Sequence, residues 1–202
     1  RNIMEILLET KNIALVVDKK PKAVTSESIR NLRTNLQFSA VDSDLKTILI
    51  TCTLPSEGKS FVSSNLAISF AQAGKRVLLI DCDLRKGRVH QLLGLPNRSG
   101  FSNLLMDDLG NVRNYVCHTM IPNLNVLTCG TYPPNPSELL SSYKNKKLIQ
   151  ILKYEYDLII FDGAPVGGLA DSVILSSLVD KTLIVTKDAS TAKNDLRKTK
   201  NR

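Results

Sequence analysis

Hydrophobic positions in this chain gather in short blocks. Five almost continuously apolar runs, rich in Val, Ile and Leu, are typical of strands covered on both faces; they lie at 47–51, 76–81, 124–128, 156–162 and 181–186. Segments with helical spacing of apolar residues stand between them, at 59–74, 100–108, 137–142, 146–155 and 170–179. This alternation predicts an α/β fold in three layers, with a mostly parallel sheet and helices on both faces.

The length of 202 residues suits one domain with a sizeable core. Residues 1–24 fit the alternation poorly, and we interpret them as an N-terminal arm or a cloning remnant before a domain at 25–202. We expect this domain to be truncated at its C-terminus, since the chain ends within a helical pattern. No apolar run approaches the roughly 20 residues that span a bilayer, and the start lacks the features of a signal peptide.

Composition narrows the choice of ligand only slightly. The net charge of +8 suits phosphate ligands or an anionic membrane face, and it equally suits an ordinary solvated surface. The four cysteines form no C-x-x-C pair and only two histidines occur, so the spacing does not predict a zinc site. Reduced thiols in a cytosolic core are the better interpretation.

The segment "TLPSEGKSF", at 53–61, follows the first strand and precedes a helix, where a phosphate-binding loop belongs. Gly58, Lys59 and Ser60 supply the close turn, the cation and the hydroxyl that such a loop needs. Thr53 replaces the usual first glycine and Pro55 offers no N–H, so the pattern is incomplete. Its alternative is a helix start with an incidental lysine.

Acidic residues at two further strand ends favour the phosphate loop. Asp81 and Asp83 follow the second strand two residues apart, and Asp162 ends another. Ligands of parallel sheets bind beyond the carboxyl ends of the strands, so these aspartates should meet Lys59 and Ser60 at one edge. This combination predicts a site for a nucleotide and Mg²⁺.

Five motifs in order resemble the bacterial tyrosine kinases of capsule and exopolysaccharide synthesis. "TLPSEGKS", "LLIDCDLRKG" and "IIFDGAP" are similar to the Walker A, A′ and B motifs of that P-loop family, "CGTYPPNPSELLSS" to its proline-containing stretch, and "SESIRNLRTNL" to its Glu-x-x-Arg-x-x-Arg helix. The likeness covers about residues 22–200, and in this family the unusual Thr53 and Pro55 are normal.

The resemblance implies a P-loop NTPase-type sheet and an ATP-dependent kinase that transfers phosphoryl groups to tyrosine, its own tyrosines included. It implies that Lys59 and Ser60 bind the phosphates and Mg²⁺, and that Asp162 contacts the metal through water. It also implies that Asp81 acts as the base and that Asp83 assists at the metal. The expected catalytic residues are thus Asp81, Asp83 and Lys59, and the expected metal ligands Ser60, Asp83 and Asp162. ATP or ADP would contact Pro55, Ser56, Glu57, Gly58, Lys59, Ser60, Phe61 and Arg85.

The resemblance also implies assembly. Glu27, Arg30 and Arg33 lie along one helical stripe, which taken alone favours a solvated face; the family likeness favours a homo-oligomeric ring built on them. The implied partners are a membrane-anchored activator of the polysaccharide co-polymerase type and the substrate tyrosines of neighbouring subunits, without nucleic acid. The expected location is the cytoplasm, at the inner face of the plasma membrane. The family's acceptor is a tyrosine-rich tail, whereas the five tyrosines of this sequence are dispersed.

Two other functions share parts of this pattern. ATP-driven switches that position division sites or plasmids use the same sheet and dimerise on ATP, but their signature lysine would fall at Leu54. A non-catalytic regulator of polysaccharide assembly would retain the fold without the chemistry, against which the complete set of Lys59, Ser60 and three aspartates counts. Kinases of the eukaryotic type are excluded because "HRD" and "DFG" are absent.

Overall fold

The computed structural model describes residues 15–39, 44–167 and 170–187. Its centre is one six-stranded sheet with the order β3-β4-β2-β5-β1-β6. All neighbouring strands run parallel except β3, which is antiparallel to β4. The strands are β1 (Thr47–Cys52), β2 (Val77–Asp81), β3 (Cys117–His118), β4 (Leu124–Leu127), β5 (Leu158–Asp162) and β6 (Lys181–Val185).

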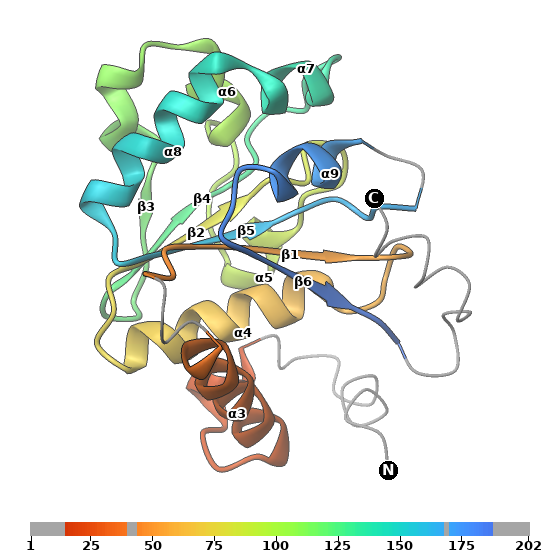
Figure 1. Ribbon diagram of the computed structural model, residues 1–202. Coiled ribbons are helices and arrows are strands. Elements are labelled where there is room, and N and C mark those ends of the chain that lie inside the picture. The colour runs from red at the N-terminus through yellow and green to blue at the C-terminus, as the bar shows by residue number, and fades with distance from the viewer. Residues whose placement is uncertain (1–14, 40–43, 168–169, 188–202) are drawn as a thin grey trace.

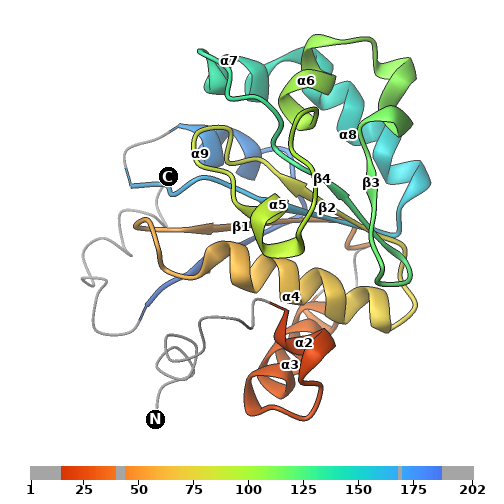
Figure 2. The same cartoon turned by 180° about the vertical axis from the view of Figure 1, so that it is seen from behind.

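Helices cover both faces of the sheet (Figures 1 and 2). One face carries α2 (Val16–Lys19), α3 (Val24–Phe38), α4 (Lys59–Gln72) and α5 (Val89–Leu93). The other carries α6 (Phe101–Met106), the 3-10 helix η1 (Leu109–Asn114), α7 (Pro136–Ser141), α8 (Tyr143–Glu155) and α9 (Asp171–Ser176). The predicted three-layer α/β fold is confirmed.

The two-residue period of a strand divides the apolar side chains between two cores. In β1, Ile48 and Ile50 pack with the helices of the α4 face, and Leu49 packs with those of the α8 face. In β2, Leu78 and Leu79 divide in the same way. Because both faces are buried, the strands read as continuous apolar runs rather than as alternating ones.

The observed elements follow the predicted ones closely, and the differences lie in short pieces. The five predicted strands are present with ends shifted by at most two residues. The two-residue β3 and the short helices α5 and η1 were not expected, because each is too short to show a period in the sequence. Within the segment interpreted as an arm, α2 places Val17 in the core, and the Val17 N–H donates to Asn65 Oδ1 of α4 at 3.1 Å.

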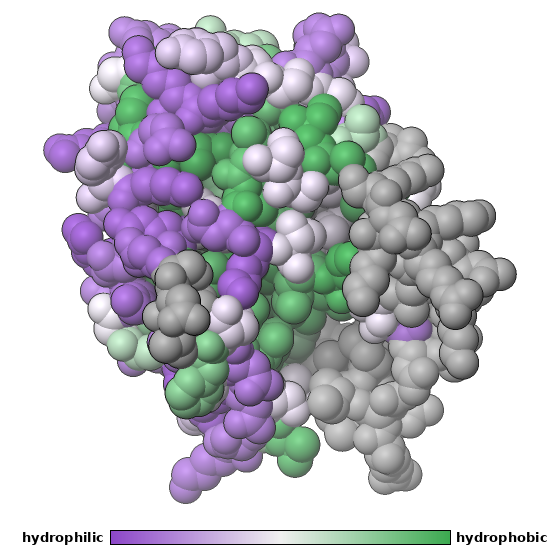
Figure 3. Space-filling view, viewed as in Figure 1, coloured by the Kyte–Doolittle hydropathy of each residue, from purple (hydrophilic) through white to green (hydrophobic). Residues whose placement is uncertain are grey.

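The sheet edge formed by β6 is more open than its centre. Leu183, Ile184 and Val185 are half-buried, whereas every residue of β1 is buried. Apolar side chains gather on the face of the molecule over β6 and α9 (Figure 3). Among the helices of the described ranges, none is long and apolar enough to cross a membrane.

Candidate active site

The loop between β1 and α4 has the backbone shape of an anion-binding turn. Ser56 and Gly58 take positive φ angles of 67° and 89°. Such left-handed residues next to a helix start turn successive N–H groups toward one point. The Glu57 carboxylate is buried and accepts the Leu54 N–H at 2.8 Å, which closes the loop on itself. The sequence TLPSEG thus adopts the backbone shape expected of a phosphate loop, without an opening glycine.

Lys59 lies at the start of α4, among acidic groups from the ends of two strands, β2 and β5. Its Nζ is 3.1 Å from Asp162 Oδ2 and 3.8 Å from Asp83 Oδ2. Burial by itself would lower the pKa of Lys59, but the negative charges of Asp162, Asp83 and Asp81 outweigh it and raise that pKa. Lys59 is therefore an ammonium group whose charge is favoured by three carboxyl groups at the carboxyl edge of the sheet.

Two hydroxyls of α4 fix the carboxylate at the end of β5. Ser60 Oγ donates to Asp162 Oδ2 at 2.7 Å, and Ser63 Oγ donates to Asp162 Oδ1 at 3.0 Å. The serines stand three residues apart and so lie on one side of the helix. The second hydroxyl was not predicted, although its helical spacing from Ser60 is visible in the sequence.

Asp81 and Asp83 differ in their surroundings. Asp81 is fully buried at the end of β2 and accepts the N–H groups of Asp83 and Val89 at 3.2 and 3.0 Å. Burial, followed by the charge of Asp162, raises the pKa of Asp81 to about 8. Asp83 accepts the N–H groups of Arg85 and Lys86 and reaches the open side of the site.

A cavity of about 400 Å³ opens in front of the phosphate loop. The predicted residues that line it are Pro55, Ser56, Gly58, Lys59, Ser60, Phe61, Asp83 and Arg85. The side chain of Glu57 is occupied within the loop, and Asp81 and Asp162 lie behind the lining residues. Lys86 and Arg88 add positive charge to the wall, and Cys52, Leu92, Pro165 and Gly167 add apolar and backbone surface.

Arg85 connects the cavity to a region that the sequence did not associate with it. Its Nε lies 2.8 Å from Asp171 Oδ2, and Asp171 is fully buried at the start of α9. The second oxygen of Asp171 accepts the hydroxyl of Ser137, from the "PPNPSELL" stretch. Asp171 belongs to no motif, so only its place at a predicted helix start, where an acidic residue often serves as a cap, could have suggested it.

The three residues expected at a subunit interface do not share one environment. Glu27 and Arg30 form an exposed ion pair of 2.7 Å on α3. Arg33, one turn further, donates from Nη1 to the carbonyl oxygen of Ser69 in α4 at 2.8 Å and lies 3.2 Å from its Oγ. Arg33 therefore holds two helices of the same chain together.

Comparison with known proteins places these motifs in a family. Residues 45–199 match the AAA domain family. Tyrosine-protein kinase YwqD of Bacillus subtilis is 41% identical over 181 residues, which cover 90% of this chain and 76% of that protein. Tyrosine-protein kinase ptk of Acinetobacter johnsonii is 36% identical over 199 residues, 98% of this chain and 27% of the longer protein.

Solved structures agree with the sequence relatives. The kinase domain of the Escherichia coli tyrosine kinase ETK superposes with a TM-score of 0.89 at 33% identity, covering 96% of this chain and 75% of that one. An ATP complex of McdA from Cyanothece has a TM-score of 0.66 at 20% identity, over 79% of this chain and 63% of its own. The second likeness shows a shared fold only.

Proposed function

The chain belongs to the bacterial tyrosine-protein kinases, and from this premise we propose that its phosphate loop binds ATP with Mg²⁺ and delivers the γ-phosphoryl group to tyrosine hydroxyls. One observation of the chain itself carries the proposal. Lys59 and Ser60 meet Asp83 and Asp162, which are distant from them in sequence, beside one cavity through contacts of 2.7–3.8 Å. Phosphoryl transfer depends mainly on such positioning and charge compensation.

The residues present fit a magnesium nucleotide. The hydroxyl of Ser60 and the carboxylates of Asp83 and Asp162 are hard oxygen donors, the kind that Mg²⁺ prefers. The start of the 14-residue helix α4, together with the N–H groups of the preceding loop, suits phosphate oxygens. Magnesium would supply charge neutralisation there, and Lys59 adds a positive charge that the protein keeps in place.

A carboxylate near the acceptor hydroxyl is the second requirement of the reaction. We assign the role of base to Asp81, supported by its place at the end of β2 beside Asp162 and Lys59. The 84–88 segment lies over Asp81, since a Cβ at Gly87 would be 2.6 Å from Asp81 Oδ2. An incoming tyrosine therefore has to displace this segment, or receive help from Asp83 at the cavity wall.

The setting of the reaction follows from the family. We infer that the chain regulates the synthesis and export of a capsular or extracellular polysaccharide. In this proposal it acts at the inner face of the plasma membrane, together with a membrane-anchored activator, and phosphorylates tyrosines of neighbouring subunits in a ring. Switch ATPases with this fold depend on a lysine where this chain has Leu54, an apolar side chain 38% exposed.

The proposal is tested by following phosphotyrosine formation on an acceptor peptide with labelled ATP and Mg²⁺, with and without the activator. Lys59→Met should abolish transfer and sharply weaken nucleotide binding, because no other lysine contacts Asp83 or Asp162 in the described part of the chain. Lys75→Met removes the same charge from an exposed turn and should behave as the wild type. ATP hydrolysis without any phosphotyrosine, in the presence of the activator, would contradict the kinase assignment.

A further inference from the structure

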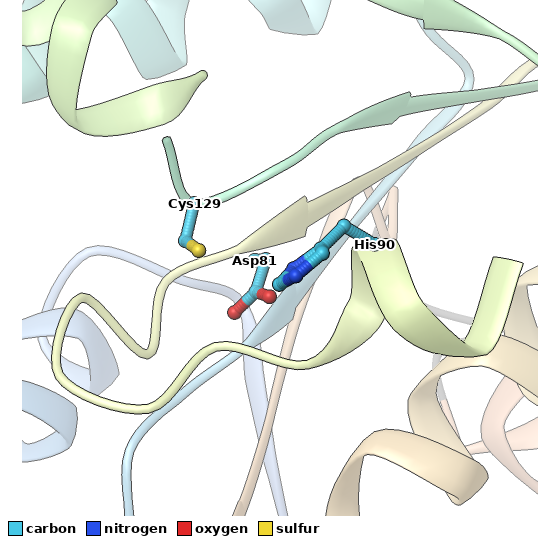
Figure 4. Close-up of side chains that lie close together, drawn as sticks. All are labelled: Asp81, His90 and Cys129. Carbon is cyan, nitrogen blue, oxygen red and sulfur yellow. The ribbon is translucent and has the colours of Figure 1, made fainter. Parts of the chain in front are cut away.

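Three side chains with metal-binding atoms meet behind the cavity. They are Asp81 at the end of β2, His90 on α5 and Cys129 after β4, and their ligand atoms lie within 4.8 Å of one another. Figure 4 shows the three side chains pointing toward one common space from three separate elements. Their sequence positions are far apart, so cysteine and histidine spacing could not reveal the group.

The histidine and the cysteine of this cluster have little other hydrogen bonding in the described part of the chain. His90 Nδ1 is buried and has no hydrogen-bond partner in the described part of the chain. The Cys129 thiol, a weak donor, contacts Asn97 Oδ1 at 3.5 Å and the carbonyl oxygen of Gly130 at 3.7 Å. A buried ring nitrogen without a partner costs free energy, and a bound cation would remove this cost.

We propose that Asp81, His90 and Cys129 bind one thiophilic divalent cation of the Zn²⁺ class. Sulfur, imidazole nitrogen and carboxylate oxygen together suit Zn²⁺ and similar ions, whereas Mg²⁺ takes oxygen ligands. Three protein ligands leave a fourth position for water. The cluster thus differs in donor type from the oxygen set of Ser60, Asp83 and Asp162.

The surrounding backbone orients the cluster. Both oxygens of Asp81 receive backbone N–H groups, from Asp83 and Val89, which fixes the carboxylate plane as outer-shell partners do in metal sites. Tetrahedral bonds of about 2.0–2.3 Å place donors roughly 3.5 Å apart, so the three groups must draw together by about 1 Å. The backbone at Gly87 closes the site on another side, because a Cβ there would be 2.6 Å from Cys129 Sγ.

Occupancy would have a consequence for catalysis that rests on the proposed function. Asp81 is the base that we assign to tyrosine activation, and a carboxylate held by a cation cannot accept the tyrosine proton. The Cys129 thiol would release its proton to solvent on becoming a ligand. Cations of this class should therefore inhibit phosphoryl transfer, whereas binding itself does not depend on kinase activity.

Cobalt is the probe for binding, since Co²⁺ accepts the same ligands and reports a thiolate bond by charge-transfer absorption. In a titration of the full chain without nucleotide, we expect one Co²⁺ per chain with this absorption, displaced by Zn²⁺ and retained in excess Mg²⁺. Cys129→Ser and His90→Gln should each weaken binding at least about 10–100-fold, as loss of outer-shell partners already does. Cys117→Ser and His118→Gln change the same residue types on β3 and should bind as the wild type.

Two outcomes would overturn the site. One is Co²⁺ binding without thiolate absorption, and the other is binding that Ser60→Ala removes but Cys129→Ser does not, which would put the cation at the phosphate loop. Circular dichroism establishes that each variant is folded. If Cys129→Ser unfolds, His90→Gln decides, because His90 is only partly buried on the short helix α5.

The inhibition is measured separately, as the ratio of phosphotyrosine formation with and without Zn²⁺ at constant excess Mg²⁺. We expect transfer to fall in the wild type at the Zn²⁺ concentration that displaces Co²⁺, and His90→Gln to need at least about tenfold more. Binding without inhibition would overturn the link to Asp81 and leave the site standing. A chain without transfer in any condition would refute the proposed function, and the Co²⁺ titration would still test the site.

Discussion

At the scale of single residues, the electrostatics of the site depend on the position of Lys59. The ammonium group contacts Asp162 and Asp83, and the charge of Asp81 acts on it as well. A buried charge is stable only when it is paired, so removing one charged side chain of this group changes the free energy of the charges that remain. Substitutions in this group should therefore combine non-additively, and single variants have to be read for binding and transfer separately.

Asp81→Asn and Asp83→Asn separate the two functions of the carboxylates. Asp81→Asn keeps the shape and removes the proton acceptor, so transfer to tyrosine should fall by about 10²–10⁴-fold while ADP binding changes much less. Asp83→Asn removes a charge from the cavity wall and from Lys59, so it should weaken binding of the magnesium nucleotide as well. Transfer assays and calorimetry with ADP·Mg²⁺ measure the two effects.

The control for this pair is Asp44→Asn, an exposed carboxylate outside the cavity. The thermal stability of the Asp81→Asn variant should be measured as well. The amide side chain cannot accept both of the N–H groups that Asp81 accepts, so the variant should be less stable. Unimpaired transfer by a folded Asp81→Asn variant, with loss in Asp83→Asn, would move the role of base to Asp83.

Much of the site could be predicted from residue types at strand ends. Lys59, Ser60 and Asp83 lie where the phosphate-loop pattern and the sheet rule put them. Burial was not predictable, since two residues of spacing cannot tell that Asp81 lies behind the lining of the cavity and Asp83 within it. The contact of Arg85 with Asp171 was also beyond the sequence, because it depends on how α9 packs.

At the scale of elements, the sheet is secured at its start as well as at its site. Asp180, just before β6, accepts the N–H groups of Lys46 and Thr47 and the Thr47 hydroxyl through Oδ2, at 2.8–2.9 Å. Its own N–H donates back to Thr47 Oγ1. This clasp sets the register of β6 against β1, whose far end leads into the phosphate loop.

Asp180→Ala should lower the free energy of unfolding by about 1 kcal/mol, since three donors lose an acceptor at a partly exposed site. Asp180→Asn keeps one oxygen acceptor and should cost less. Although burial alone would raise it, the hydrogen bonds from Thr47 and Lys46 lower the pKa of Asp180 below 3.8. The stabilisation is thus complete above about pH 4 and is lost as the pH falls through the lower folded value.

Urea unfolding of the wild type and both variants, at neutral pH and at about pH 3, measures these differences. The advantage of the wild type over Asp180→Asn should shrink at the lower pH. An advantage that is equal at both pH values would show that the charge of Asp180 does not contribute to stability.

Helices and strands were predictable where burial left a clear pattern of apolar residues in the sequence. The five long strands were found because both faces of the sheet are covered, which turns each of them into an apolar run. β3, with two residues, and α5, with five, have no such run. Their formation depends on neighbours: β3 on pairing with β4, and α5 on Val89, which packs into the core beside α4.

At the scale of the whole molecule, we propose that copies of the chain assemble through α3. Glu27→Ala with Arg30→Ala should shift an oligomer toward monomers, because this ion pair lies at the surface of α3, with Glu27 exposed and Arg30 partly exposed, where a neighbour could contact it. Asn31→Ala with Gln37→Ala changes two other exposed positions of α3 and should leave assembly unchanged. Light scattering at matched concentration, with nucleotide and activator, compares the variants.

A wild-type chain that is monomeric under these conditions would contradict the ring. So would an assembly that the two exposed substitutions at Glu27 and Arg30 leave intact. Arg33→Ala is a poor test of the same idea, since it also removes hydrogen bonds within the chain and should reduce stability by itself.

The hydrogen bond from Arg33 to Ser69 also fixes how α3 is oriented relative to the phosphate loop. α3 is fastened to α4, and α4 begins with Lys59, so the outer helix and the phosphate loop turn as one body. A neighbouring subunit that binds α3 would then determine both the orientation of each site and its distance from that subunit. In a ring of copies joined in this way, every site would face its neighbour in the same direction around the ring.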